Sequence, residues 1–337
     1  MSEAEAVFDR LGSASSLAIV CHDDPDPDCL SGAIALEFLA RERGVDAVDI
    51  LYGGSISHQQ NRAFVNAFDV NLEAYSDARL ADHDLVAFVD HSFPGTHNSV
   101  PSDTQVDIVV DHHPSDRPVP GEIVDLRPAY GATATILTEY VRDLPVEMTT
   151  RVASGLLFGL HRERLDFIRQ PTVHEYEAAG YLDPRADVEM LRELYGASFT
   201  AETVDAVGAA IHDRVRRDGC LVSTVGRTTG HGPLVQAADY LLNIEGVSTV
   251  LVWGLVDDEI QLSVRSVRED VDLGDRLDRA FGDVGRAGGH GDMAGGQLPL
   301  GLFGDVADDD DRLLEMVDRR IRSRFFGAMG VADDDRA

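Results

Sequence analysis

The sequence predicts an α/β protein: a parallel sheet with helices on both faces, followed by a smaller α/β C-terminal domain. Short apolar runs with little alternation recur in the first half of the chain, as in strands buried on both faces, at 17–20, 48–52, 85–89 and 107–110. Helical patterns lie between these runs, and such alternation is typical of βαβ units. Beyond residue 200, a helix and three further strand-like runs precede a glycine-rich stretch.

The expected elements follow in chain order. Helices are predicted first at 30–43 and 59–68, and then in succession at 132–142, 149–160, 172–182 and 186–195. In the second half we expect a helix at 201–217, strands at 221–225, 249–256 and 260–265, a glycine-rich stretch at 285–296, a final strand and a closing helix at 312–326. Residues 196–200 form a plausible boundary. We therefore expect domains at 1–197 and 198–330, with a disordered acidic tail at 331–337.

The charge of the chain is extreme. Its 337 residues carry a formal net charge of −31, and all 29 basic residues are arginine. The acidic residues are spread along the chain, which favours a solvating shell suited to high intracellular salt, as in halophilic microbes, over a specific basic partner. At about 1 M salt the Debye length is only about 3 Å, and arginine–phosphate contacts also weaken, so small ligands are favoured over long strands.

Cysteine use and hydropathy indicate the compartment. No apolar run approaches the roughly 18 residues that span a bilayer, and the acidic start lacks the basic residues of a secretory signal. Three cysteines, none of them in a CxxC pair, do not make a disulfide framework. We expect a cytoplasmic, reduced protein without membrane contact.

Acidic and histidine side chains cluster after three of the predicted strands. They are His22, Asp26 and Asp28; Asp90; and Asp111, His112 and His113. Ligands bind outside the carboxyl ends of the strands in an open α/β sheet, so we expect these groups to meet there. Their nitrogen and oxygen atoms suit two divalent cations and a hydrolytic centre.

Each cluster also has a structural interpretation. Pro25 and Pro27 would stiffen an extended loop from which the carboxylates fan out, but the same residues fit a turn before a helix capped by Asp28 or Ser31. A single aspartate after a strand, such as Asp90, is usually a cap or turn residue. Two adjacent histidines behind an aspartate have few structural uses at a strand end.

The combined pattern is more specific than its parts. His-x3-Asp-x-Asp, an aspartate after a later strand, and then Asp-His-His, in that order, resemble the DHH phosphoesterase family. That family includes RecJ-like exonucleases, oligoribonucleases that also dephosphorylate adenosine 3′,5′-bisphosphate, and manganese pyrophosphatases. The small-residue segment 130–136 resembles the helix start after the third motif. Residues 263–266 followed by Gly288, Gly289 and His290 resemble the nucleotide-binding C-terminal (DHHA1-type) domain, so the resemblance covers essentially the whole chain.

The resemblance implies a two-metal centre. One cation would be held by His22, Asp26 and Asp90, and the second by Asp28, Asp90 and His112, with Asp90 bridging. The cations would activate a water that attacks phosphorus. Asp111 and His113 would contact the phosphate or orient ligands. Mixed carboxylate and imidazole ligands favour Mn²⁺, with Mg²⁺ or Co²⁺ as possible substitutes.

The fourth motif departs from the family pattern. An aspartate after an apolar helix usually completes the second metal site, but this region reads His161-Arg162-Glu163-Arg164-Leu165-Asp166. Glu163 stands at the expected position and Asp166 is the other candidate. Glutamate could still ligate, or it could leave the second metal weakly held. We favour Glu163.

The second domain would bind the substrate. Backbone N–H groups at Gly288 and Gly289 can approach a phosphate or base, with Arg265 or His290 gripping it, although a simple glycine turn is the structural alternative. The expected activity is hydrolysis of phosphodiester or phosphomonoester bonds in short oligonucleotides or small nucleotides. One alternative is a non-catalytic or weakly active nucleic-acid-binding, replication-associated relative. The other is an inorganic pyrophosphatase, disfavoured by the absence of lysine and by Gly-Gly-His. Homodimerisation is plausible by analogy.

Overall fold

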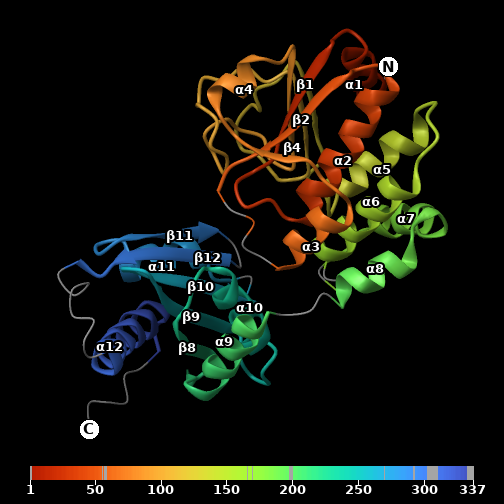
Figure 1. Ribbon diagram of the computed structural model, residues 1–337. Coiled ribbons are helices and arrows are strands. Elements are labelled where there is room, and N and C mark those ends of the chain that lie inside the picture. The colour runs from red at the N-terminus through yellow and green to blue at the C-terminus, as the bar shows by residue number, and fades with distance from the viewer. Residues whose placement is uncertain are drawn as a thin grey trace. The chain divides into compact units, whose positions relative to one another are not determined.

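The computed structural model divides into two compact units, Met1–Ala197 and Ser198–Ala337 (Figure 1). The residues that it describes are 2–54, 56, 59–164, 166–168, 170–196, 200–268, 270–290, 293–301 and 310–331. Most of the predicted acidic tail, from residue 332 onward, lies outside the described residues. Among the described helices, none is both long enough and apolar enough to cross a lipid bilayer.

The first unit contains a six-stranded parallel sheet, which confirms the predicted fold class. Its strands are β1 (Ser16–Val20), β2 (Ala47–Tyr52), β3 (Leu72–Ala74), β4 (Leu85–Val89), β5 (Ile108–Asp111) and β6 (Ile123–Leu126). Their order is β3-β2-β1-β4-β5-β6. The chain builds outward from β1 to β3 and then returns to place β4 beside β1. The direction of winding therefore reverses between β1 and β4, and ligands bind at such switch points.

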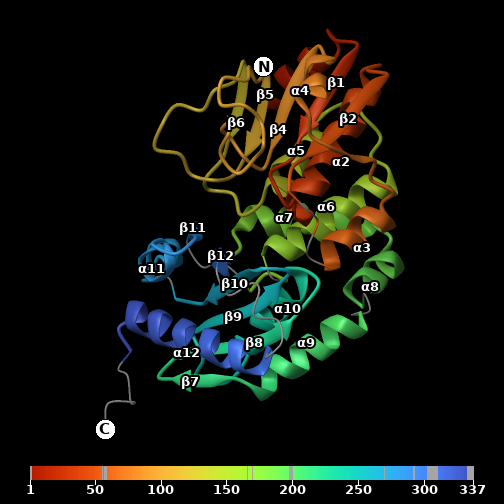
Figure 2. The same cartoon turned by 60° about the vertical axis from the view of Figure 1, so that its left-hand side comes forward.

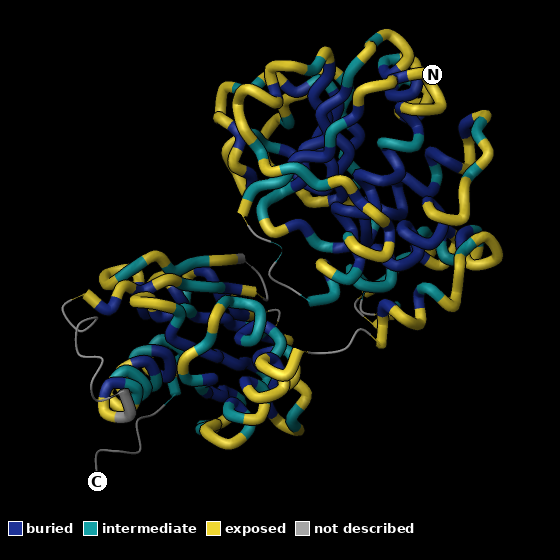
Figure 3. Tube along the Cα trace, in the orientation of Figure 1, coloured by how far each residue is buried: buried dark blue, intermediate teal, exposed yellow. Residues whose placement is uncertain are grey.

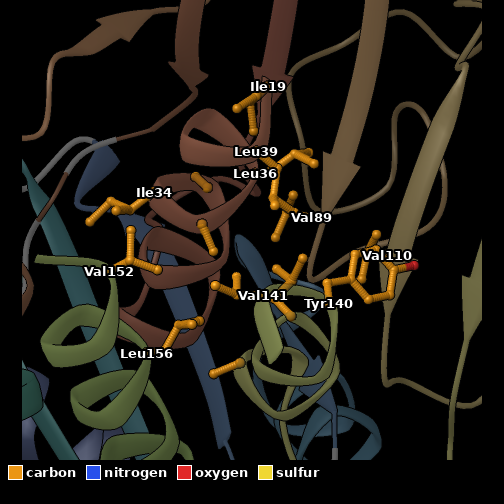
Figure 4. Packing of buried hydrophobic residues seen from close by; sticks show 14 of the residues in the cluster. Ile19, Ile34, Leu36, Leu39, Val89, Val110, Tyr140, Val141, Val152 and Leu156 are labelled. Carbon is orange, nitrogen blue, oxygen red and sulfur yellow. The ribbon is translucent and has the colours of Figure 1, made fainter. Parts of the chain in front are cut away.

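Helices cover one face of this sheet. The described helices on that side are α1 (Glu3–Leu11), α2 (Pro27–Glu42), α3 (Gln59–Ala67), α5 (Thr133–Asp143), α6 (Thr150–Glu163), α7 (Val173–Leu182) and α8 (Val188–Tyr195). Figure 4 shows Leu36 and Leu39 of α2 packed near Ile19 and Val89 of the sheet. The opposite face is covered by the short helix α4 (Asp77–Ala81) and by the loop after β4, through Leu80, Val100 and Val106.

The start of α2 corrects the prediction for residues 25–28. The helix begins at Pro27, three residues earlier than expected, because proline at the first helical position lacks only an N–H that would be unpaired anyway. Asp26 is the N-cap and accepts from the backbone N–H groups of Asp28 and Cys29. Asp28 therefore lies inside the first turn rather than in an extended loop.

The second unit contains a mixed sheet in the order β11-β12-β10-β9-β8-β7. Its strands are β7 (Val215–Arg217), β8 (Cys220–Arg227), β9 (Thr249–Val256), β10 (Glu259–Ser266), β11 (Arg286–His290) and β12 (Met293–Pro299). Among the described strands of this sheet, β8 and β9 pair in parallel and the other neighbours are antiparallel. The glycine-rich stretch thus forms β11 and most of β12, and does not precede the final strand as predicted.

Two apolar clusters lie on the two faces of the second sheet. Figure 2 shows the helices of this unit with its strands, and Figure 3 marks its buried residues in dark blue. The helices are α9 (Ala201–His212) and α10 (Gly232–Leu241) on one face, and α11 (Leu273–Phe281) and α12 (Asp310–Met329) on the other. The prediction of one helix over 201–217 was too long, because the chain leaves the helix at Asp213 and residues 215–217 pair with β8.

Candidate metal centre

Three strand ends meet at the switch point of the parallel sheet. Asp90 directly follows β4, Asp111 is the last residue of β5, and His22 lies two residues beyond β1. The register of the parallel strands places these three ends at nearly the same height in the sheet, because Val20 lies opposite Phe88, and Val89 lies opposite Val110. The clusters predicted from sequence are therefore brought to one edge.

The backbone of Asp90 leaves its strand in a left-handed conformation. Its φ is +65°, which is uncommon for a residue with a Cβ, although aspartate tolerates it better than most. The Asp90 N–H donates to the carbonyl of Val110 at 2.9 Å. Strained backbone held in this way is often found at functional sites.

The Asp90 carboxylate lies between histidines from two other segments. Its Oδ2 is 3.7 Å from His22 Nε2, and its Oδ1 is 3.5 Å from His112 Nε2. Asp26 Oδ1 lies 4.0 Å from His22 Nε2, and Asp28 Oδ2 lies 3.9 Å from His112 Nε2. Two ligand atoms that each lie about 2.0–2.2 Å from one cation are separated by up to about 4.4 Å. Each of the four pairs is therefore close enough to share a cation, but Asp26 Oδ1 already accepts two backbone N–H groups, so Asp26 would bind through its other oxygen.

Helix α5 orients two of these carboxylates. Both oxygens of Asp28 accept backbone N–H groups at its start, from Thr133 and Ala134, each at 2.8 Å. The hydroxyl of Thr133 donates to Asp90 Oδ1 at 2.8 Å. A carboxylate oxygen has two lone pairs, so Asp28 Oδ2, which faces His112, can accept this bond and still bind a cation.

The electrostatics of the cluster favour a bound cation. Burial, followed by the charge of Asp26, raises the pKa of Asp28 to about 7. Burial also raises the pKa of Asp90 well above its usual value, and the charges of Asp28 and Asp26 raise it further. The negative charges of these carboxylates repel one another in a site with little water. A bound divalent cation would neutralise this repulsion and lower both pKa values again.

The two histidines of the third motif have different environments. Burial, with the charge of His113, lowers the pKa of His112 to about 4, so His112 is neutral and can ligate a metal. His113 is 58% exposed and lies 2.8 Å from Asp111. Burial by itself would lower the pKa of His113. The hydrogen bond with Asp111 and the negative charge of Asp111 outweigh burial, so the pKa of His113 is raised.

Asp111 forms hydrogen bonds with His113 and Ser92 rather than with the other candidate ligands. It accepts from the hydroxyl of Ser92 at 2.5 Å and from the backbone N–H of His113 at 3.0 Å. Burial works to raise the pKa of Asp111, but these interactions and the charge of His113 prevail and lower it to about 2. Asp111 is therefore an ionised group that holds the His113 ring.

Two residues that the sequence prediction missed lie in the cluster. The Sγ of Cys29 lies within 4.8 Å of ligand atoms of both His22 and Asp90. His91 is buried: its Nδ1 lies 3.0 Å from the carbonyl of Val89, and its Nε2 has no partner among the described residues. An orphaned buried nitrogen of this kind is commonly satisfied by a water or ion. The available signals were the position of Cys29 three residues after Asp26 and that of His91 directly after Asp90.

The two fourth-motif candidates have different surroundings. Glu163 is the last residue of α6, and its charge raises the pKa of both Asp90 and His113. Asp166 instead accepts from the hydroxyl of Tyr195 at 2.8 Å and lies 3.1 Å from His161 Nδ1. Asp166 is thus engaged with these two side chains, and Glu163 Oε1 lies 3.6 Å from Arg164 Nη2, so ligation by Glu163 stays a prediction.

The candidate residues of the second unit lie toward one edge of its sheet. Register places Arg265 opposite Met293, and Met293 opposite His290, in one row across β10, β12 and β11. Arg265 Nε donates to Asp239 Oδ1 at 2.9 Å. A Cβ added at Gly288 would meet nothing within 4 Å, whereas one at Gly289 would lie 2.4 Å from the carbonyl of Met293. The side chain of His290 lies outside the described residues.

Together, the fold and the site define a two-unit α/β protein with a candidate divalent-metal centre at the carboxyl edge of a parallel sheet. The sequence matches the N-terminal domain of the DHH family over residues 16–160 and the DHHA1 domain over residues 217–323. The chain belongs to the DHH phosphoesterase family.

Known proteins of several kinds resemble this chain. It is 33% identical over 322 residues to an uncharacterized protein of Methanocaldococcus jannaschii, covering 95% of this chain and 65% of the relative. It is 28% identical over 172 residues to a probable manganese-dependent inorganic pyrophosphatase of Streptococcus thermophilus, covering 49% of this chain and 53% of the relative. The chain thus spans only part of these curated relatives. An exopolyphosphatase-related protein from Bacteroides fragilis has the same fold, with a TM-score of 0.72 and 15% identity over 94% of this chain and 98% of that one.

Proposed function

We propose that this protein is a divalent-metal-dependent phosphoesterase that hydrolyses short oligonucleotides or small nucleotides. The position of Asp90 carries the proposal. Its two oxygens face His22 and His112 from different strand ends, and Asp28 is buried beside it. A carboxylate with one oxygen toward each of two histidines is suited to bridge two cations.

The ligand set would be divided between two positions. His22, Asp26 and Asp90 would hold one cation, and Asp28, Asp90 and His112 the other, with Glu163 as the further candidate at the second. Nitrogen and oxygen donors suit Mn²⁺, and Mg²⁺ or Co²⁺ could replace it. When bound, such a pair supplies charge neutralisation at a phosphoryl group and a water of lowered pKa.

The chain's own residues would position and neutralise the substrate. Asp111 raises the pKa of His113 and so favours its protonated form, in which the exposed ring could donate to a non-bridging phosphate oxygen. Thr133 fixes the orientation of Asp90 through its hydroxyl. We propose that the glycines of β11 offer backbone N–H groups to the nucleotide.

The pyrophosphatase alternative has one observation in its favour. The Streptococcus thermophilus relative, by its name, acts on inorganic pyrophosphate with manganese. That match covers only 49% of this chain, however, while residues 217–323 match the DHHA1 domain. A lysine- and arginine-rich phosphate clamp is also not available to a chain without lysine. We therefore rank nucleotide hydrolysis first.

A substrate panel tests the proposal. Purified protein in multimolar KCl with Mn²⁺ would be given dinucleotides, longer RNA and DNA, adenosine bisphosphate, cyclic dinucleotides and pyrophosphate, with a chelator as the control. We expect turnover of a short nucleotide that the chelator abolishes. Release of phosphate from pyrophosphate alone would establish the pyrophosphatase alternative. Binding of nucleic acid without turnover of any substrate would support the non-catalytic one.

A further inference from the structure

A thiol lies inside the candidate metal centre. Cys29 occupies the first turn of α2 and is fully buried. Its Sγ, a nitrogen of His22 and an oxygen of Asp90 all lie within 4.8 Å of one another. Sulfur, imidazole and carboxylate are the three ligand types that Zn²⁺ takes in proteins.

We infer that Cys29, His22 and Asp90 form a site for a thiophilic cation such as Zn²⁺, overlapping the first of the two proposed metal positions. The inference rests on the geometry of the proposed centre but not on its hydrolytic activity. Sulfur ligation would capture Zn²⁺ or Cd²⁺ where the oxygen ligands of Asp26 would hold Mn²⁺.

The two alternative ligands come from the same helix start. Asp26 Oδ1 lies 4.0 Å from His22 Nε2, and Asp26 already accepts two backbone N–H groups of α2. Cys29 lies three residues further along, on the same side of the helix. His22 and Asp90 are common to both sets, so the third ligand decides which cation is preferred. Thiolate selects soft cations, and carboxylate selects hard ones.

Binding requires Cys29 to lose its proton. In the metal-free protein the thiol donates to the carbonyl of Val89 at 3.4 Å. The cation would replace this proton, which passes to solvent, and a sulfur–metal bond would replace the S–H bond. No oxidant or reductant is involved.

The competing interpretation is that Cys29 is a small apolar residue of the core. It belongs to the apolar cluster beneath the sheet, as does Cys21. A buried thiol of that kind gives no metal-dependent signal. Cys21 is equally buried, and its thiol is hydrogen-bonded to that of Cys29, so Cys21→Ala tests whether the neighbouring thiol contributes to the signal, and Cys220 in the second unit is the remote control.

Ultraviolet absorption during Cd²⁺ titration tests the inference. Cadmium–thiolate bonds give a charge-transfer band that oxygen and nitrogen ligands do not. We expect this band in the full-length protein and in Cys21→Ala and Cys220→Ala, and we expect its loss in both Cys29→Ala and Cys29→Ser. Zn²⁺ affinity, measured by calorimetry, should fall about tenfold or more in the Cys29 variants, since losing even an outer partner of a metal ligand has an effect of that size.

The outcomes separate this inference from the proposed function. A band that persists in both Cys29 variants, or that is absent from the full-length protein, would overturn it even if Mn²⁺-dependent hydrolysis is found. A band that requires Cys29 would support it even if the substrate panel shows no turnover. Circular dichroism of each variant checks that it is folded.

Discussion

The carboxyl edge of the first sheet and the β11–β12 edge of the second build their candidate sites in different ways. At the first edge, Asp28, Asp90 and His112 are buried and converge from segments far apart in sequence. At the second edge, Arg265 shares a row with His290 across a locally paired sheet, Gly288 and Gly289 lie in the two preceding rows, and Gly288 leaves open space where a side chain would be.

The difference indicates how each region meets a ligand. A cluster of buried acids is electrostatically unfavourable by itself and is completed by cations. An edge strand rich in glycine offers backbone groups and little charge, so it is suited to hold the uncharged parts of a substrate or a phosphate by hydrogen bonds. Substitution of a residue at the first site should therefore reduce catalytic activity more than substitution at the second.

The largest effect is expected for Asp90→Asn. The amide cannot place an anionic oxygen toward both His22 and His112, so one or both cations should be lost. Turnover should fall at least about 100-fold, because metal ions contribute several kcal/mol of charge stabilisation. Steady-state kinetics with bound-metal analysis would measure it. Asp143→Asn, on α5 and paired with Arg142, is the control. Near-normal turnover in Asp90→Asn would exclude the bridging role.

The stability of the metal-free protein should depend on Asp28. The pKa of Asp28 is raised to about 7 in the folded chain and is about 3.9 when unfolded. Between these two pH values the carboxyl group of Asp28 is ionised in the unfolded chain but still protonated in the folded one. The contribution of Asp28 to the free energy of unfolding is therefore full below about pH 4 and is lost as the pH rises toward 7. Thermal unfolding with a chelator should show this decline, and Asp28→Asn or saturating Mn²⁺ should reduce it. An identical pH profile in Asp28→Asn would contradict the buried-acid description.

A smaller effect is expected for Thr133→Val. This change removes the hydroxyl that donates to Asp90 Oδ1 but keeps the backbone N–H that binds Asp28. Metal affinity should fall about tenfold, the lower end of what partners of metal ligands contribute. Thr138→Val is the matched control, because its hydroxyl binds the carbonyl of Ala134 in the same helix. Equal Mn²⁺ affinities of the two variants would show that Thr133 does not orient Asp90.

The smallest effect is expected at the second edge, for Gly288→Ala. The added methyl group meets nothing in the protein, so folding should be unaffected. If the backbone there binds the nucleotide, the methyl group should obstruct the close approach of the ligand. The KM for a dinucleotide should then rise about two- to tenfold, which corresponds to the loss of about one hydrogen bond. The KM for a small chromogenic phosphodiester should stay constant. Gly208→Ala in α9 also adds a methyl group in open space and serves as the control. An equal rise for both substrates would remove the proposed role of this edge.

The sequence predicts the first site better than the second for a physical reason. Strands buried on both faces leave an apolar signal, and polar residues at their ends are conspicuous, so His22, Asp90 and His112 could be found in advance. The helix start at Pro27 differs from the prediction because proline, which stiffens a loop and breaks a helix interior, is also well suited to the first helical position. β3 and β6 were missed because these edge strands are only three and four residues long and are mostly half-buried.

Other features depended on contacts that no local pattern encodes. The capping of α5 by Asp28 joins residues 105 and 106 positions apart. The membership of Cys29 in the cluster depends on where β4 ends relative to α2. In the second unit, glycines that resemble a loop form strands because β12 pairs with β10. Tertiary pairing thus overrides the low strand propensity of glycine.

The long-range capping of α5 also fixes when the metal centre can form during synthesis. Asp28 and Asp90 acquire their final orientation only when Thr133 and Ala134 are in place. A nascent chain that has emerged only as far as Asp90 has both of these carboxylates but not the helix that holds them or the imidazole of His112. If this centre binds cations as proposed, they would load late in the biogenesis of the first unit, and a polypeptide truncated before α5 should bind them more weakly than the full chain.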